Sequence, residues 1–386
     1  MKLTGITCLD LSLFLPGPTV SQIMSDHGAR VIKIESLGEG EPNRHIGQRR
    51  GEESVYFSCT HRGNESLSLN LKSQAGLEVF MRLAASADVI IESFRPGVVK
   101  RLGVDYDAVR EVKPDIVYAS ISAYGQSGPL VNDPAHDLAV EAMCGLLSNN
   151  VDAENRPVMP GMPSGDMLAA TLTLSGILMA LFRREQTGRG DYLDVAMMDS
   201  ILACMPNSMG AVFADQAPPK PKEERIWGGS AFYRIYATAD GAHVTLGGSE
   251  IKFATNALNA LGRPDLIELC KLPPGKGQLP VVAFLEQTFV SRTQAEWIEF
   301  FEPLDVCFAP VNDLRAGLDL EQTRHRQMCV TDESGKEHLG TPLKFSGEPA
   351  VINFQAPGHG QQAEAILQEL GYTPTDVERL RGQHVI

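Results

Sequence analysis

The sequence predicts an α/β protein, built from a large parallel-sheet domain and a smaller second domain. Strand-like and helix-like segments alternate through the first hundred residues, and the strand-like segments are almost continuously apolar. Such strands are typical of parallel sheets that are covered on both faces. The composition changes after about residue 205, and a chain of 386 residues is long for one core.

The alternation can be followed element by element. Strands are expected at residues 5–12, 29–36, 88–94 and 115–125, and helices at 19–28, 75–87 and 106–112. Gly28 should end the first helix, because glycine readily adopts the left-handed conformation of a helix C-terminus. The turn after the first strand, FLPGPT, has no GxGxxG pattern, which argues against a nicotinamide or flavin cofactor.

The longest apolar stretch covers residues 167–182. It is shorter than the roughly 20 residues that span a bilayer, and Ser175 and Gly176 interrupt it. We therefore expect a buried helix.

The second domain follows a Pro-rich, charged linker. Residues 231–248 indicate two strands around an Asp240-Gly241 turn, and residues 292–304 indicate a helix. The helical tail at 361–383 should pack back on the first domain. The expected division is 1–205 for the large domain, 206–222 for the linker, 223–320 for the small domain and 321–386 for a return segment completing the large domain.

Charge and cysteine content exclude several classes of protein. The net charge is −14 and no basic run is present, so neither nucleic acid nor an anionic membrane is an expected partner. Seven scattered cysteines without a CxxC pair argue against disulfides and against a metal site. The first residues lack the apolar run of a signal peptide and the final HVI is not a peroxisomal signal, so a cytoplasmic location is expected.

His136 is the first candidate catalytic residue. Asp133 and Pro134 resemble an N-cap and a first helical residue, which would place His136 in the first turn of a helix. The positive helix end would lower the pKa of the imidazole and favour a neutral general base. A capping or packing histidine would suit the same position. The buried stripe of this helix is expected to contain Leu138, Ala142, Met143, Leu146 and Leu147.

Asp166 is the second candidate, in the first turn of the long apolar helix. An acid there could simply complement the helix dipole. Beside so apolar a helix, desolvation would instead raise its pKa and keep it protonated. One base and one acid of opposed tendency would suit proton transfer at a carbon atom.

Several segments together resemble the family III CoA-transferases and their relatives, the alpha-methylacyl-CoA racemases. The similarity extends from about residue 3 to 345 and includes the segments 14–36, 66–80, 88–103, 118–129 and 183–202. It implies a large Rossmann-like domain completed by the C-terminal segment, a smaller α+β domain, and two chains interlocked as a homodimer.

Four features resemble the racemase branch: the motif AHDL, the segments GGSEIKF and WGGSAFY, and the run PLDVCFAPV at 303–311. The resemblance implies racemisation of 2-methylacyl-CoA thioesters by 1,1-proton transfer through an enolate. His136 and Asp166 would be the proton carriers, Glu250 would orient His136, and the backbone N–H of Asp137 would bind the enolate oxygen. The alternative is a CoA-transferase, in which Asp166 forms an acyl anhydride and then a CoA thioester.

Coenzyme A would enter as part of the substrate, and no metal or redox cofactor is implied. By resemblance, Lys72, Phe94, Arg95 and Arg101 line its adenine and phosphate site. Both branches usually have an arginine where this chain has Ser36. Lys33, Arg44 or another residue would have to replace that contact.

Overall fold

The computed structural model describes all 386 residues, which form two compact units. Unit 1 contains residues 1–144, 161–204 and 321–386, and unit 2 contains residues 145–160 and 205–320. The expected large domain ran without a break to residue 205, whereas here residues 145–160 group with unit 2. The bridge between Val151 and Pro157 folds this excursion on itself, and Lys222 Nζ donates to the Ala153 carbonyl at 2.6 Å.

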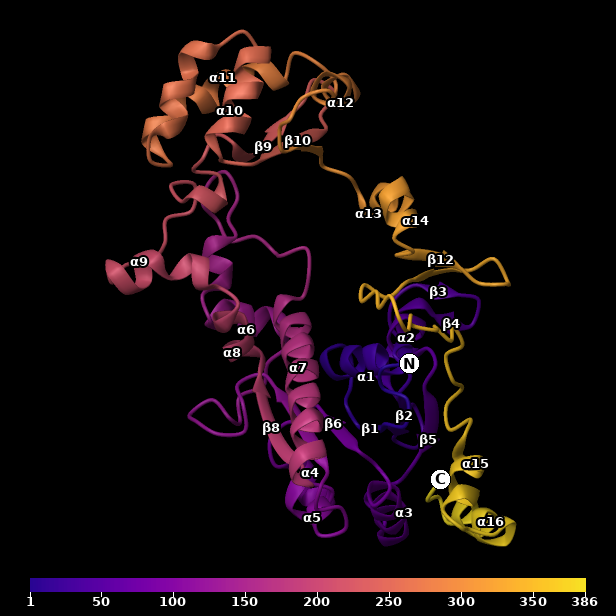
Figure 1. Ribbon diagram of the computed structural model, residues 1–386. Helices are drawn as coiled ribbons and strands as arrows, with labels where there is room; N and C mark the ends of the chain where they lie inside the picture. The colour runs from indigo at the N-terminus through magenta and orange to yellow at the C-terminus, as the bar shows by residue number, and fades with distance from the viewer. The chain divides into compact units, whose positions relative to one another are not determined.

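Unit 1 is built on a six-stranded sheet in the order β5-β2-β1-β6-β7-β8 (Figure 1). Its strands are β1 (Thr7–Asp10), β2 (Arg30–Glu35), β5 (Glu65–Ser68), β6 (Val89–Glu92), β7 (Val117–Ser122) and β8 (Asp191–Ala196). Every pairing is parallel. Counted in chain order, the strands run 3-2-1-4-5-6, which is the Rossmann order and confirms the expected fold class. The order reverses between β1 and β6, where such sheets leave a crevice at their carboxyl edge.

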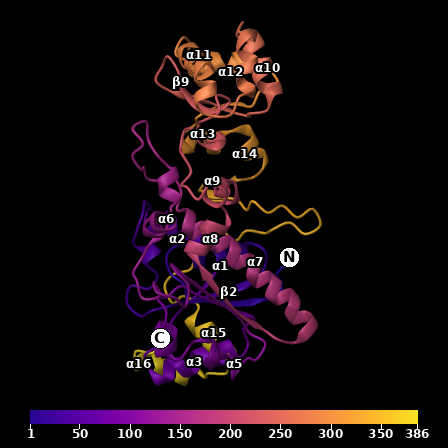
Figure 2. The same cartoon turned by 90° about the vertical axis from the view of Figure 1, so that its left-hand side faces the viewer.

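Helices cover both faces of this sheet. One core cluster joins side chains of the sheet to helices that include the return segment (Figures 1 and 2). These helices are α3 (Gln74–Ala84), α4 (Val98–Leu102), α5 (Tyr106–Arg110), α15 (Ala363–Glu369) and α16 (Pro374–Gly382). Helices α1 (Pro16–Asp26) and α7 (Ser164–Thr187) pack against each other, α1 on β1 and β2 and α7 on β7 and β8. Gly28 follows α1 with φ +102°, as expected of a residue that reverses the chain after a helix.

Helix α7 differs from the expected buried helix. Residues such as Ala170, Thr173 and Ile177 are buried, but the opposite face exposes large apolar side chains. These are Leu172, Leu178, Met179 and Phe182, which we call the exposed face of α7. The prediction failed because the apolar residues surround the helix, whereas the sheet and α1 cover only one side of it. By length and composition alone, α7 is also the one helix that meets the criteria for a membrane span, and 33% of its most apolar window is buried.

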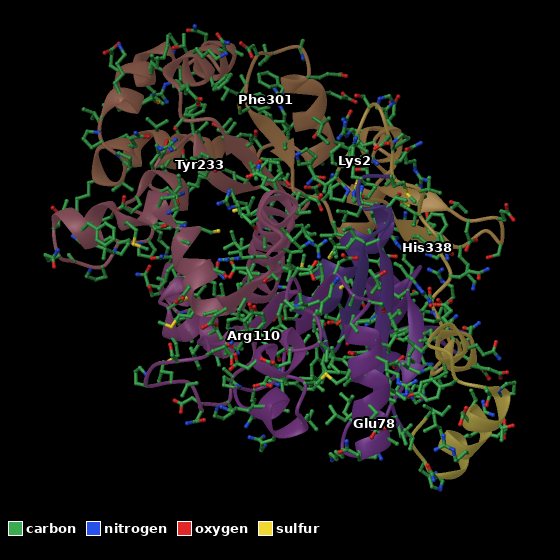
Figure 3. The ribbon with its side chains drawn as sticks, turned by 60° about the horizontal axis from the view of Figure 1, so that its bottom comes forward. Lys2, Glu78, Arg110, Tyr233, Phe301 and His338 are labelled. Carbon is green, nitrogen blue, oxygen red and sulfur yellow. The ribbon has the colours of Figure 1, made fainter.

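Unit 2 has a three-stranded antiparallel sheet in the order β11-β10-β9. Its strands are β9 (Tyr233–Ala237), β10 (His243–Gly247) and β11 (Phe308–Pro310), and its longer helices are α10 (Ile251–Ala260), α11 (Leu279–Phe289) and α12 (Gln294–Phe301). The expected Asp240-Gly241 turn joins β9 to β10, and Gly241 has φ +78°. Thr293 and Glu296 form a capping box that starts α12. Phe301 on α12 (Figure 3) stacks on Phe308 with ring centroids 4.5 Å apart, which ties this helix to β11.

Shorter elements complete both units. In unit 1 these are β3 (Arg49–Arg50), β4 (Glu53–Ser54), α2 (Val55–His61), α6 (Asp137–Met143), α8 (Met197–Ala203), α14 (Glu321–His325), β12 (Cys329–Thr331) and β13 (Glu337–Leu339). In unit 2 they are α9 (Met209–Ala214) and α13 (Leu314–Asp319). Single turns of 3₁₀ helix lie at residues 42–44, 146–149, 206–208, 225–227 and 276–278, and a longer stretch at 264–271.

A buried cluster of charges lies at the carboxyl ends of β1 and β2. The Lys33 side chain is completely buried, and its ammonium lies 3.4 Å from an Asp10 carboxylate oxygen and 3.1 Å from one of Glu41. Burial alone would lower the pKa of Lys33, but the charges of Asp10 and Glu41 outweigh it and raise the pKa. The lysine is therefore held as a cation between two buried carboxylates.

Replacing Lys33 with Met should destabilise unit 1 by about 3–5 kcal/mol, because two buried carboxylates lose their counterion. The measurement is hydrogen exchange of the β1 and β2 amides. Tryptophan fluorescence would instead report on unit 2, because both tryptophans, Trp227 and Trp297, belong to that unit. The control is Arg110→Met on α5 (Figure 3), which breaks an exposed 3.7 Å pair with Asp107. That change should cost less than about 1 kcal/mol. Equal protection in both variants would contradict the role given to Lys33.

Candidate active site

A cavity of about 400 Å³ opens at the carboxyl edge of the sheet in unit 1. Its walls come from the segments that follow β1, β6 and β7, from the residues preceding α6, and from α7 and α8. They include Phe14, Phe94, Arg95, Tyr124, His136 and Asp166. The cavity lies where the strand order reverses, which is the usual place for a ligand in this fold. Asp194 of β8 steadies the wall after β7 by accepting the Gln126 N–H at 3.1 Å.

His136 lies at the start of α6, but not in its first turn. The helix begins at Asp137 and His136 is the N-cap, with an extended backbone and no capping bond from its side chain. The prediction that Asp133 caps this helix is wrong, because Asp133 instead closes a turn on Leu130 and the first helical bonds reach the carbonyl of His136. The imidazole ring contacts the Phe14 ring edge-on, with centroids 5.8 Å apart.

Phe14 is held in a strained conformation beside His136. Its φ of +64° is uncommon for a residue with a side chain. The carboxylate of Glu41 accepts its N–H at 2.9 Å, and the amide of Asn43 donates to its carbonyl. Both partners are fully buried, and Glu41 is also paired with Lys33. The buried charges of Lys33, Asp10 and Glu41 are thus connected to the wall of the cavity through Phe14.

Asp166 lies in the first turn of α7 and faces the same cavity. Burial raises the pKa of its carboxyl to about 7, and the negative charges of Asp137 and Glu141 add to this effect. The direction agrees with the pKa expected from desolvation. Tyr56 of α2 also lies near this carboxylate. Burial and the charge of Asp166 raise the pKa of the Tyr56 phenol to about 12.

Two carboxylates of α6 hold the start of α7. Asp137 Oδ1 accepts the backbone N–H of Asp166 at 3.0 Å, and Glu141 Oε1 accepts that of Ser164 at 2.9 Å. The expected apolar stripe of α6 is wrong: Leu138 is 42% exposed and Met143 57%, while Val140 and Glu141 are buried. Glu141 was not identified as a site residue from the sequence, because an acidic residue in a short helix is usually exposed and nothing in the pattern marks it as buried. The backbone N–H of Asp137 has no hydrogen-bond partner in the chain.

The structure brings only some of the predicted substrate-binding residues together. Phe94 and Arg95 line the cavity beside His136 and Asp166, whereas Lys72 and Arg101 are exposed outside its wall. Neither Arg95 nor Arg101 forms an ion pair. The Phe94 N–H is held at 2.7 Å by Glu92, a buried carboxyl whose pKa burial raises to about 7. Sequence reasoning missed Glu92 because it reads as part of an ordinary strand.

Neither basic residue suggested as a replacement at Ser36 is free. Lys33 is enclosed in the charge cluster. Arg44 makes two bonds to the Glu35 carboxylate, at 2.7 and 2.8 Å, and stacks over the ring of Phe57. Within the chain, Lys33 is fully enclosed and the Arg44 guanidinium is paired with Glu35.

Glu250 belongs to unit 2 and is exposed. It precedes α10 as the N-cap residue, and its side chain makes no capping hydrogen bond. Its carboxylate forms no ion pair or hydrogen bond within the chain.

Comparison with known proteins identifies the family of the chain. The model of the family "CoA-transferase family III" matches residues 3–363. The acetyl-CoA:oxalate CoA-transferase of Acetobacter aceti is 32% identical, over 95% of each chain. The human alpha-methylacyl-CoA racemase is 28% identical, over 100% of this chain and 98% of its own. A crystal structure of a CAIB/BAIF family protein from Brucella suis superposes with a TM-score of 0.82 at 26% identity, covering 95% of this chain and 99% of the other. The protein therefore belongs to the family III CoA-transferases, an enzyme family whose similar members include both transferases and racemases.

Proposed function

We propose that this protein racemises 2-methylacyl-CoA thioesters by moving a proton between the two faces of the α-carbon. The observation that carries the proposal is the placement of His136 and Asp166 on the wall of one cavity. They come from different elements, so each can approach a bound substrate from its own direction. Substrates of the acyl-CoA class suit the family as a whole.

The chemistry requires a base, an acid and a site for negative charge. The α-hydrogen of a thioester is weakly acidic because its anion delocalises onto the carbonyl oxygen. His136 takes that proton from one face, and Asp166 returns a proton to the other. The raised pKa of Asp166, about 7, supports this role, because the carboxyl can hold a proton near neutral pH. In the reverse direction the two residues exchange roles.

The enolate oxygen needs a hydrogen-bond donor while charge develops on it. In this proposal the donor is the N–H of Asp137, which is free and adjacent to His136. The Asp137 side chain supports the opposite carrier, because it holds the backbone of Asp166.

Coenzyme A is anchored by residues that follow β6. Phe94 and Arg95 lie on the cavity wall, and Arg101 follows on α4. Neither arginine forms an ion pair, and Arg95, Arg101 and Lys72 after β5 are all exposed. Exposed cations in an acidic protein suit the phosphates of the carrier.

The proposal includes a homodimer in which a second copy covers the exposed face of α7. Four large apolar side chains on one helix face would otherwise remain in water. In the dimer, Glu250 of the partner subunit orients His136. Its exposure and its lack of any partner within its own chain support this role.

A CoA-transferase is the second candidate. It is favoured by the 32% identity to an acetyl-CoA:oxalate CoA-transferase over 95% of both chains. In that reaction the Asp166 carboxylate attacks the thioester carbonyl and expels CoA as a thiolate, which leaves an acyl anhydride on Asp166. The thiolate then attacks the aspartyl carbonyl and releases the acyl group as a carboxylate. The acceptor acid finally takes over the CoA through a second anhydride.

Incubation of one enantiomer of a 2-methylacyl-CoA in heavy water, without an acceptor acid, tests the main proposal. The wild-type protein should introduce deuterium at the α-carbon and lose optical purity. His136→Ala and Asp166→Asn should each slow racemisation by about 10²–10⁴-fold, because each removes one proton carrier, and should leave CoA binding intact. The contrary result is no exchange, with CoA transfer after an acid is added and a covalent mass increase on Asp166.

The exchange rate should depend on the ionisation of Asp166. When His136 is the base, Asp166 must be protonated, so the rate should fall as the pH rises through about 7. When Asp166 is the base it must be ionised, so the rate for the other enantiomer should fall as the pH drops below about 7. Profiles of kcat for the two enantiomers, measured from pH 5 to 9, would show this difference. Identical profiles would contradict the division of roles.

Replacing Met179 and Phe182 with Asp should shift the protein from dimer to monomer, because the change places two charges in an interface that buries the exposed face of α7. Light scattering coupled to size-exclusion chromatography measures the mass. The control is Val112→Asp, which changes another exposed apolar residue of unit 1 and should leave the mass unaltered. A wild-type protein that is monomeric at all concentrations would refute the dimer.

A further inference from the structure

The first turn of α7 is an unusual place for a carboxyl with a raised pKa. The free N–H groups and the dipole at a helix N-terminus normally stabilise a carboxylate there, which lowers its pKa. In this protein the N–H groups of Ser164 and Asp166 are already donated to Glu141 and Asp137. The two acids lie four residues apart on one face of α6, so they reach the helix end together.

Glu141 stands out because it is buried without a cation. Its exposed fraction is 0%, it forms no ion pair, and its Oε2 has no hydrogen-bond partner. Burying a carboxylate costs several kcal/mol unless other groups offset the loss of water. The only donor that meets Glu141 is the Ser164 N–H at the positive end of α7. A serine or asparagine would cap the helix without burying a charge, so the charge itself calls for an explanation.

We propose that Glu141 is a positioning residue for Asp166, whose buried charge occupies the end of α7 and thereby keeps a proton on the Asp166 carboxyl. This inference deepens the proposed function and rests on it, because a proton carrier must hold a proton before it can deliver one. Glu141 does not line the cavity, so it acts through Asp166 and the backbone of α7.

The surroundings of Asp166 agree with this role. Burial makes the largest contribution to its raised pKa, and the charges of Asp137 and Glu141 follow. Tyr56 on α2 lies near the same carboxyl, and the cavity wall adds Asp133, His136 and Arg95. Arg95 is the only permanent cation in this set. The charged groups that contribute to the raised pKa of Asp166 are the two carboxylates on α6, which also accept N–H groups at the start of α7.

The variant Glu141→Gln tests the proposal because it preserves the side-chain shape and the oxygen that accepts the Ser164 N–H, but removes the charge. We expect the Asp166 carboxyl to titrate at a pH lower by about one unit. Carbon NMR of protein labelled at the aspartate carboxyl carbon would follow it, with the resonance assigned from Asp166→Asn. In the heavy-water assay, the alkaline limb of kcat should shift to lower pH by the same amount, with KM unchanged.

Two further variants keep the test decisive. If Glu141→Gln does not fold, Asp137→Asn should shift the titration in the same direction. Glu185→Gln changes an exposed acid on the same helix, roughly 28 Å further along its axis, and should shift nothing. An Asp166 titration that is the same in wild type and Glu141→Gln would overturn the inference. A shifted titration in a protein without proton exchange would support the role of Glu141 and refute the racemase function alone.

Discussion

A lysine removed from water, and the two carboxylates that hold it, constrain the part of the sheet on which the site depends. Lys33 of β2 lies between Asp10 of β1 and Glu41. Such an arrangement is stable only when every member is present, since a single uncompensated charge in the interior costs several kcal/mol. Because Glu41 also holds the N–H of Phe14, the same charges fix the strained residue that contacts His136. The geometry of the cavity is therefore coupled to the register of β1 and β2.

The opposite wall of the cavity depends on two helices that meet end to side. Helix α6 presents His136 at its start and two carboxylates on its inner face, and these carboxylates receive the start of α7. One helix thus places His136 and shapes the surroundings of Asp166. Because the anion-binding end of α7 is already filled, Asp166 lies at a helix N-terminus without the usual stabilisation of its charged form. The raised pKa of Asp166 then follows from packing.

Much of the fold could be predicted because it rests on local patterns. Apolar runs predict the strands β1, β2, β6 and β7, and the residue types Asp240 and Gly241 predict the turn between β9 and β10. Strand β5 was not predicted as a strand, since four residues with two serines carry little hydrophobic signal. The start of α6 was misplaced because Asp133 and Pro134 suit a turn as well as a helix N-terminus. The burial of α7 was overestimated, since a periodicity analysis cannot say how many sides of an apolar helix find a partner.

The sequence by itself determined the alternation of strands and helices, the family, and the pair His136 and Asp166, since these depend on local pattern and on motifs preserved along the chain. Tertiary structure alone decided that both residues line one cavity with Phe94 and Arg95, that Lys33 and Arg44 are committed to ion pairs, and that Glu141 is buried beneath α7. The reason is physical: desolvation and charge proximity arise between residues far apart in the chain. Glu141 and Ser164 are 23 residues apart in the sequence, and only folding brings the Glu141 carboxylate within 2.9 Å of the Ser164 N–H.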